Sequence, residues 1–185
     1  MIISKTPYRI SFFGGGTDYP SWYEKNSGAV ISTTINKYSY ILLRQQPDIF
    51  DYKYIIRYFK REERSKLHDI EHPVVREVFK LFKFKKGMTL IHHGDLPART
   101  GIASSSAFTV GLINAASRLQ NFKINSRTLA KKAIYVEQNL LKENVGSQDQ
   151  VALSYGGLNR INFNKREIFN CKKLKYRKEN YQLLE

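Results

Sequence analysis

Cysteine is nearly absent from this chain, which has Cys171 as its only thiol among 185 residues. One thiol cannot form an intramolecular disulfide, and it excludes a metal site built from several cysteines. The segment 1–7 lacks the apolar core of a signal peptide, and no stretch approaches the length needed to cross a bilayer. We therefore expect a cytoplasmic protein in a reducing compartment, with no membrane partner.

Acidic residues are also scarce, because 16 Asp and Glu stand against 31 Lys and Arg and leave a net charge of +15. This charge attracts anions of any kind and does not distinguish RNA from a phosphorylated metabolite. Basic residues spread over solvated faces explain it equally well. Hydrophobic residues make up 42% of the chain, enough for a buried core, and no linker interrupts it. We expect one domain spanning 1–185.

The opening segment 2–12 has the period-two alternation of a half-buried strand. The predicted apolar face holds Tyr8, Ile10 and Phe12, and the opposite face holds Arg9 and Ser11. The glycines at 14–16 tolerate positive φ, so a tight turn is predicted directly after this strand.

Further strands and helices are predicted from hydrophobic periodicity and turn residues. Strands are expected at 29–35 and 38–44, joined by a turn at Asn36-Lys37, and also at 53–59 and 88–91. Helices are expected around 74–82, at 104–119 and from 126 to about 144, and a hairpin from 158 onward. This order favours an α+β fold with a mixed sheet packed against helices.

The segment Leu96–Ala107 carries the clearest functional pattern, because small residues precede a predicted helix. Ser104 is a natural N-cap for that helix. Unpaired backbone N–H groups and the macrodipole at a helix start can hold phosphate oxygens. A hydroxyl of the serine run 104–106 could also reach a magnesium ion. The alternative is a capped helix start that only packs closely; a Walker A loop is excluded because no Gly-Lys-Ser/Thr ending is present.

This segment resembles the second motif of the GHMP kinases, commonly Pro-x-x-x-Gly-Leu-Gly-Ser-Ser-Ala. Ala103 stands where the family usually has glycine. The resemblance implies a GHMP kinase amino-terminal domain with a ribosomal-protein-like fold, and ATP as the phosphate donor. The implied ATP-binding residues are Pro97, Gly101, Ile102, Ala103, Ser104, Ser105 and Ser106.

The segment Pro7–Tyr19 is similar to the first motif of galactokinase-type members, in which Arg precedes a Gly-rich turn ending in Thr-Asp-Tyr. The resemblance implies that Asp18, with Thr17 and Gly16, binds the sugar substrate, and that Arg9 lies beside the catalytic carboxylate. An ionised carboxylate only accepts hydrogen bonds, which suits a polyhydroxylated ligand. Taken alone, the same residues also fit an ordinary Gly-rich turn.

A third match joins Glu137 to the loop Gly146–Gln150, twelve positions separating the glutamate from Asp149. In the family pattern the glutamate holds Mg²⁺ together with a loop serine, here Ser105, and the aspartate acts as base or orienting group. Mg²⁺ prefers oxygen ligands, so one carboxylate, one hydroxyl and ATP phosphates form a plausible shell. In isolation, Glu137 would be read as a solvated helix residue and Asp149 as a helix cap.

Together the three motifs look most like D-glycero-D-manno-heptose 7-phosphate kinases of bacterial polysaccharide synthesis, which phosphorylate an anomeric hydroxyl. The family's third, Gly-rich motif does not follow Asp149, so we expect the carboxy-terminal domain to be absent. Two hypotheses follow. The chain is a kinase, assisted by a separate carboxy-terminal half or by a second copy, or it is a non-catalytic remnant that binds nucleotide or a partner.

Two other sites are disfavoured. His92 and His93 are adjacent in a predicted strand, so their side chains point to opposite faces and cannot share one metal ion. The basic cluster at 172–178 could contact RNA, but no RNA-recognition signature accompanies it, so nucleic acid is not an expected partner.

Overall fold

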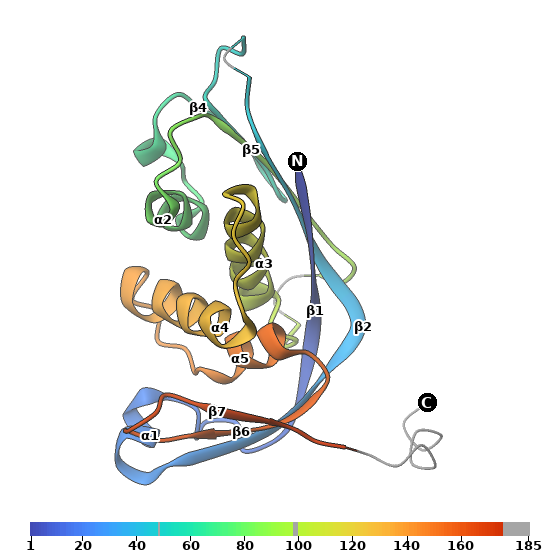
Figure 1. Cartoon of the computed structure of the whole chain (residues 1–185), viewed down its shortest axis with the longest axis vertical. Helices are drawn as coiled ribbons and strands as arrows, with labels where there is room; N and C mark the ends of the chain where they lie inside the picture. Colours follow the sequence, from blue (N-terminus) through green and yellow to red (C-terminus); the bar gives the residue numbers. More distant parts are fainter. Residues whose placement is uncertain (48, 98–99, 176–185) are drawn as a thin grey trace.

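A curved mixed sheet with helices on one of its faces forms the molecule (Figure 1). The structure is a computed structural model that describes residues 1–47, 49–97 and 100–175. The sheet runs β4-β3-β5-β2-β6-β7, and β1 pairs with the other edge of β2. Among the strands of the described residues, only β3 and β5 pair in parallel. The predicted α+β fold with a mixed sheet is therefore confirmed.

The elements follow one another with short connections. The strands are β1 Ile2–Phe13, β2 Gly28–Gln45, β3 Tyr54–Arg57, β4 Arg61–Arg64, β5 Met88–Gly94, β6 Leu158–Phe163 and β7 Asn170–Lys173. The α-helices are α1 Pro20–Asn26, α2 Pro73–Phe82, α3 Ser104–Leu119, α4 Ser126–Ile134 and α5 Gln148–Tyr155. A 3₁₀ turn covers Leu67–Asp69, and α4 continues into a π-helix, Tyr135–Leu140. The short elements α1, β4 and α5 were not predicted.

The predicted turn at Asn36-Lys37 is wrong, because β2 continues through both residues as one 18-residue strand. Its pairing with β1 moves from Pro7↔Tyr38 to Arg9↔Thr34, so β2 carries extra residues at this point. Asn36 and Lys37 lie in this irregularity and are exposed. The polar pair therefore marks a bulge that bends β2, and continued pairing with β1 keeps the strand intact.

The same irregularity overturns the predicted faces of β1. Tyr8 and Arg9 are consecutive yet both buried, at 1% and 8% exposure, whereas Ile10 and Phe12 are 43% and 45% exposed. A bulge shifts the alternation by one residue, so the inward face passes from even to odd positions. Arg9 thereby joins the helix-covered side of the sheet, although a simple alternation places it opposite Tyr8.

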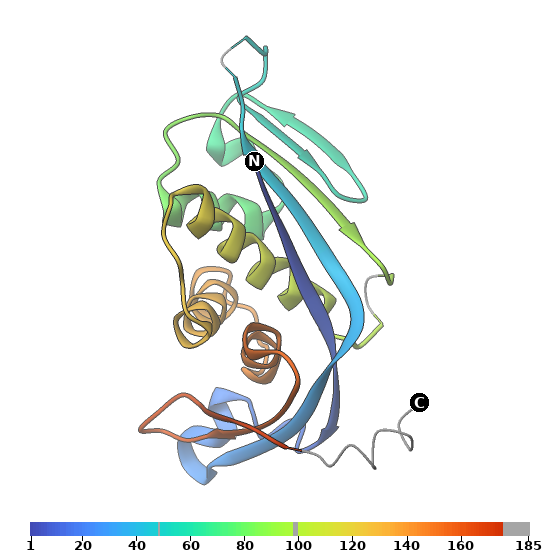
Figure 2. The ribbon, with the colours of Figure 1, turned by 45° about the vertical axis from the view of Figure 1, so that its right-hand side comes forward.

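Helix α3 is the centre of the main core, between the sheet and helices α2 and α4 (Figure 2). Most of its residues are buried, including Ala107, Leu112, Ile113 and Ala116, so its small residues let neighbouring elements approach closely. A second, smaller core lies under α1 and β6 around Tyr23, Val30 and Phe163. Within the described residues, none of the helices combines the length and apolarity that a membrane crossing requires.

Candidate active site

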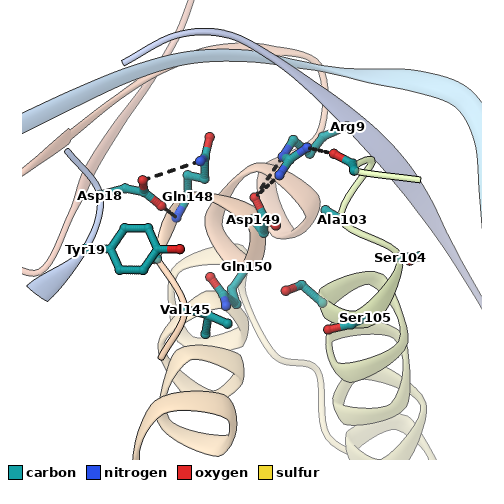
Figure 3. A pocket seen from close by; sticks show the side chains of 13 residues that line it. Arg9, Asp18, Tyr19, Ala103, Ser104, Ser105, Val145, Gln148, Asp149 and Gln150 are labelled. Atoms are coloured by element: carbon teal, nitrogen blue, oxygen red, sulfur yellow. Dashed lines mark hydrogen bonds and ion pairs between the residues drawn. The ribbon is translucent and has the colours of Figure 1, made fainter. Parts of the chain in front are cut away.

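A pocket of about 310 Å³ opens where β1, the start of α3 and the loop before α5 meet (Figure 3). Three segments far apart in the sequence supply its walls. Its lining is Arg9, Asp18, Tyr19, Gly101, Ala103, Ser104, Ser105, Ser106, Val145, Gly146, Gln148, Asp149 and Gln150. The three motifs singled out in the sequence therefore converge on one space.

Arg9 and Asp149 form an ion pair inside this pocket. The Nε and Nη2 atoms of Arg9 both donate to Oδ1 of Asp149, at 2.8 and 2.5 Å. The remaining Nη1 donates to the carbonyl of Gly101 at 2.7 Å, so Arg9 also ties the phosphate-loop segment to β1. Burial raises the pKa of Asp149, and the Arg9 charge opposes that rise. No described residue donates to Oδ2 of Asp149.

Asp18 is almost completely buried and is held by the loop that carries Asp149. Its Oδ2 accepts from the backbone N–H of Gln148 at 3.1 Å, and its Oδ1 accepts from Gly16 N–H at 3.1 Å. The Gln148 side chain approaches Oδ1 at 3.4 Å (Figure 3) and accepts from Ser11 at 2.8 Å. The carboxylate packs directly on Gly146, where an added Cβ would collide with it. Glycine at 146 is therefore a steric requirement.

The start of α3 differs from the prediction at Ser104, which is the first helical residue and not the N-cap. The N-cap is Ala103, with φ 65° and ψ 36° and no side-chain hydrogen bond. A Cβ costs roughly 1–2 kcal/mol in this left-handed conformation, so glycine would fit the position better than alanine does. Within the described part of the chain, the first-turn N–H groups of α3 therefore have no side-chain cap, and Ser104, Ser105 and Ser106 all line the pocket.

Glu137 lies behind the serine run and is 1% exposed. One carboxylate oxygen accepts from Ser106 at 3.0 Å and from the Gln150 amide, while Oε1 has no partner among the described protein atoms. Burial raises the pKa of Glu137 to about 7, although the Gln150 hydrogen bond opposes the rise. Among the described residues no three His, Cys, Asp or Glu side chains converge, so a cation here would need hydroxyl, phosphate or water oxygens as well.

An apolar pocket of about 390 Å³ adjoins the first one and shares Ser104 and Ser105 with it. Within it the ring of His72 stacks on Phe108, with centroids 4.5 Å apart and planes at 14°. His92 also lines this space and its Nε2 lies 3.0 Å from the Ser39 hydroxyl, whereas His93 is exposed. Burial lowers the pKa of His92 to about 4, so its ring is neutral at pH 7 and adds to an apolar wall.

Several predicted site residues shape the pocket without lining it. Gly16 and Thr17 form the turn behind Asp18, with the Thr17 hydroxyl donating to Gly14 at 2.7 Å. Pro97 accepts from the Thr100 hydroxyl, and Ile102 accepts from the Arg9 backbone. Residues 98–99 of the same motif, and 176–178 of the basic cluster, lie outside the described residues.

Sequence reasoning did not select five lining residues: Tyr19, Val145, Gly146, Gln148 and Gln150. Gln148 and Gln150 flank Asp149 in the matched loop, so their positions could have been found from the motif. Their roles could not have been found from the motif, because a side-chain amide forms hydrogen bonds with solvent and with protein alike.

Comparison with known proteins identifies the family that this domain resembles. Residues 70–157 match the family described as the GHMP kinases N terminal domain. The chain carries a GHMP kinase amino-terminal domain. It is 32% identical to D-glycero-alpha-D-manno-heptose 7-phosphate kinase of Campylobacter jejuni, an alignment that covers 94% of this chain and 55% of the relative. The chain thus spans about half the length of that curated relative.

Solved structures show the same fold. The domain superposes with a TM-score of 0.86 on D-glycero-D-manno-heptose 1-phosphate kinase from Bacteroides thetaiotaomicron, at 21% identity, covering 97% of this chain and 61% of that one. Phosphomevalonate kinase from Streptococcus pneumoniae, solved with phosphomevalonate and AMPPNP, gives 0.74 at 16% identity, covering 95% and 59%. At these identities the likeness establishes the fold of the GHMP amino-terminal domain and nothing finer.

Proposed function

We propose that this domain supplies the nucleotide and substrate sites of an ATP-dependent sugar-phosphate kinase. The substrate is D-glycero-D-manno-heptose 7-phosphate, phosphorylated at its anomeric hydroxyl. The relative named for that sugar, 32% identical over most of this chain, supports the choice. The observation that carries the proposal is that the Arg9–Asp149 ion pair and the uncapped start of α3 line the same pocket.

Asp149 is the proposed base or orienting group. Its Oδ1 is engaged by Arg9, so Oδ2 is the oxygen available to accept the proton of a sugar hydroxyl. Arg9 favours the ionised form of this buried carboxylate, because its charge opposes the rise in pKa that burial produces. Phosphoryl transfer depends chiefly on positioning and charge neutralisation, and a fixed base next to a cation provides both.

The ATP phosphates are proposed to lie at the loop Gly101–Ser106. The backbone N–H groups of Ser104, Ser105 and Ser106 open α3 and have no side-chain cap, so phosphate oxygens would satisfy them. The apolar pocket that shares Ser104 and Ser105 suits the nucleobase, because the stacked His72 and Phe108 rings form one wall of it. Pro97 and Ile102 shape the loop, and Ala103 sets its turn.

Ser105 and Glu137 are the proposed ligands of Mg²⁺. The buried, unpartnered Oε1 of Glu137 fits a hard cation, which would also stabilise the ionised carboxylate. When bound, Mg²⁺ neutralises charge on the transferred phosphoryl group.

Asp18 is proposed to bind sugar hydroxyls, with Gly16 and Thr17 holding its turn. Two backbone N–H donors fix this buried carboxylate at the edge of the pocket that contains Asp149. A fixed acceptor near the reacting hydroxyl orients the sugar, and the acceptor itself loses no further conformational entropy when the sugar binds.

Activity is proposed to need a further half, supplied by a separate carboxy-terminal chain or by a second copy. The supporting surface is Ile10, Phe12 and Phe13, which are 43%, 45% and 71% exposed beside a second cavity of about 430 Å³. That cavity shares Arg9, Gly101 and Gln148 with the first pocket. The competing function is a non-catalytic remnant that binds nucleotide or a partner, and the strained Ala103 favours it.

ADP release from Mg-ATP and heptose 7-phosphate tests the proposal. It is measured for the wild-type chain and Asp149→Asn, each alone and with the carboxy-terminal half of the Campylobacter relative. Turnover that Asp149→Asn abolishes supports the kinase. Binding of an ATP analogue that Asp149→Asn leaves unchanged, with no turnover in any mixture, supports the remnant instead.

A further inference from the structure

The π-helix Tyr135–Leu140 is hydrogen-bonded to the loop 145–147, which precedes Gln148 and Asp149. Its wide turn is seen in the hydrogen bond from Leu141 N–H to the carbonyl of Val136, five residues back, at 2.9 Å. Such an insertion turns the side chains that follow it relative to a regular α-helix, and π-turns occur frequently at functional sites. The residues that it presents here are Glu137 and Gln138.

Gln138 bonds to both sides of Gly146. Its side-chain amide Nε2 donates to the carbonyl of Val145 at 2.9 Å and to the hydroxyl of Ser147 at 3.0 Å. Ser147 is completely buried, and its backbone N–H donates to the carbonyl of Asp18 at 2.9 Å. One amide group therefore fixes the short segment against which the Asp18 carboxylate packs.

Gln138 does not touch the pocket itself. It lines a separate groove of about 790 Å³, and Val145 lines both that groove and the proposed active site. The loop 145–147 is thus a thin wall, with the Gln138 amide on one side and Asp18 on the other. An added Cβ at Gly146 would collide with Asp18, so this wall has little room to shift.

We propose that Gln138 is a positioning residue for the sugar site: its amide clamps Val145 and Ser147 so that Asp18 and Gln148 keep their binding geometry. This inference rests on the proposed function, because it assigns a task to the site that would take the sugar phosphate. The proposed role of Gln138 concerns the sugar site and not the nucleotide site, since no described hydrogen bond links Gln138 to the loop 101–106.

The test compares Gln138→Glu, Gln138→Met and the matched control Asn139→Asp in the full chain. Glutamate keeps the shape but loses the donor when ionised, whereas methionine keeps the length and loses the donor at every pH. Asn139 is the exposed next residue, and its change adds the same charge without a described bond to the loop.

Amide hydrogen exchange of 145–148, measured without ligands, is the first readout. At pH 7.5 we expect both Gln138 variants to exchange about tenfold faster than wild type, from the loss of a hydrogen bond to a loop. The control Asn139→Asp should exchange at the wild-type rate.

Calorimetric binding of heptose 7-phosphate and of AMPPNP is the second readout. We expect sugar-phosphate affinity to fall about tenfold in both Gln138 variants and AMPPNP affinity to change less than twofold. Unchanged exchange in Gln138→Met, or an equal loss of both affinities, overturns the proposal. If wild type binds no heptose 7-phosphate, the proposed substrate fails, and the exchange rates alone decide whether Gln138 clamps the loop.

Discussion

Arg9 approaches Asp149 from one side, so that two of its nitrogen atoms donate to the same carboxylate oxygen across 140 residues of sequence. This geometry keeps the other oxygen, Oδ2, free of described donors. It also explains why the irregular pairing between β1 and β2 matters. Without the shift in alternation, Arg9 would lie on the face of the sheet that helices do not cover.

Replacing Arg9 with methionine should raise the pKa of Asp149 further. Burial already raises this pKa and the guanidinium opposes it, so loss of the charge leaves burial unopposed. We expect the Asp149 pKa of this variant to lie above that of wild type, measured from the carboxyl carbon shift in a pH titration. Any acid limb of kcat/KM should move to higher pH with it. Arg57→Met, at an exposed position of β3, is the control, and equal titration curves for the two variants would contradict the assignment.

Replacing Ala103 with glycine should stabilise the domain and strengthen nucleotide binding. The left-handed conformation of Ala103 carries a Cβ penalty that glycine removes, and we expect about 1 kcal/mol in urea unfolding. Lys83→Gly is a matched comparison, because Lys83 is also left-handed, at the C-cap of α2. Both variants should gain stability, but only Ala103→Gly should bind AMPPNP more tightly. A parallel gain in affinity for both would argue against phosphates at Ala103.

Glu137 should make stability fall as pH rises from about 4.5 to 7. Its pKa is about 7 in the folded chain against 4.5 in a model compound, so between these values the folded state holds a proton that the unfolded state has lost. Relative to Glu137→Gln, wild type should lose about 3 kcal/mol across this range, measured by urea unfolding at several pH values.

Added Mg²⁺ gives the corresponding control for Glu137. If this carboxylate is a magnesium ligand, millimolar Mg²⁺ with AMPPNP at pH 7.5 should restore stability to wild type and not to Glu137→Gln. A wild-type stability curve parallel to that of Glu137→Gln at every pH would show that the carboxyl does not titrate in this window.

Replacing Gly146 with alanine should displace Asp18. The added Cβ meets the Asp18 carboxylate, so either the loop or the carboxylate has to move. We expect heptose 7-phosphate affinity to fall by about tenfold or more, with AMPPNP affinity nearly unchanged. Gly15→Ala provides the steric comparison, because its Cβ would meet only the Gln148 amide, at 3.9 Å. Gly15→Ala should keep wild-type stability in thermal unfolding, whereas Gly146→Ala should not.

Much of the fold followed from local patterns. The strand at 2–13, the helices at 73–82 and 104–119 and the final hairpin come from periodicities of two and 3.6, and these depend only on neighbouring residues. The predictions failed where partners from elsewhere in the chain decide the outcome. Asn36 and Lys37 have turn chemistry, but the residues on both sides of them pair with β1, so β2 continues as one strand through this bulge.

The sequence by itself determined which chemical groups are available and their order: Arg9 before Asp18, the serine run 104–106, then Glu137 and Asp149. Those motifs were enough to assign the fold and the kinase family. Only the tertiary structure decided that Arg9 faces inward, that Ala103 caps α3 in a left-handed conformation, and that Gln138 holds the loop before Asp149. The physical reason is that bulges, strained caps and buried hydrogen bonds depend on contacts between distant segments, which local periodicity does not encode.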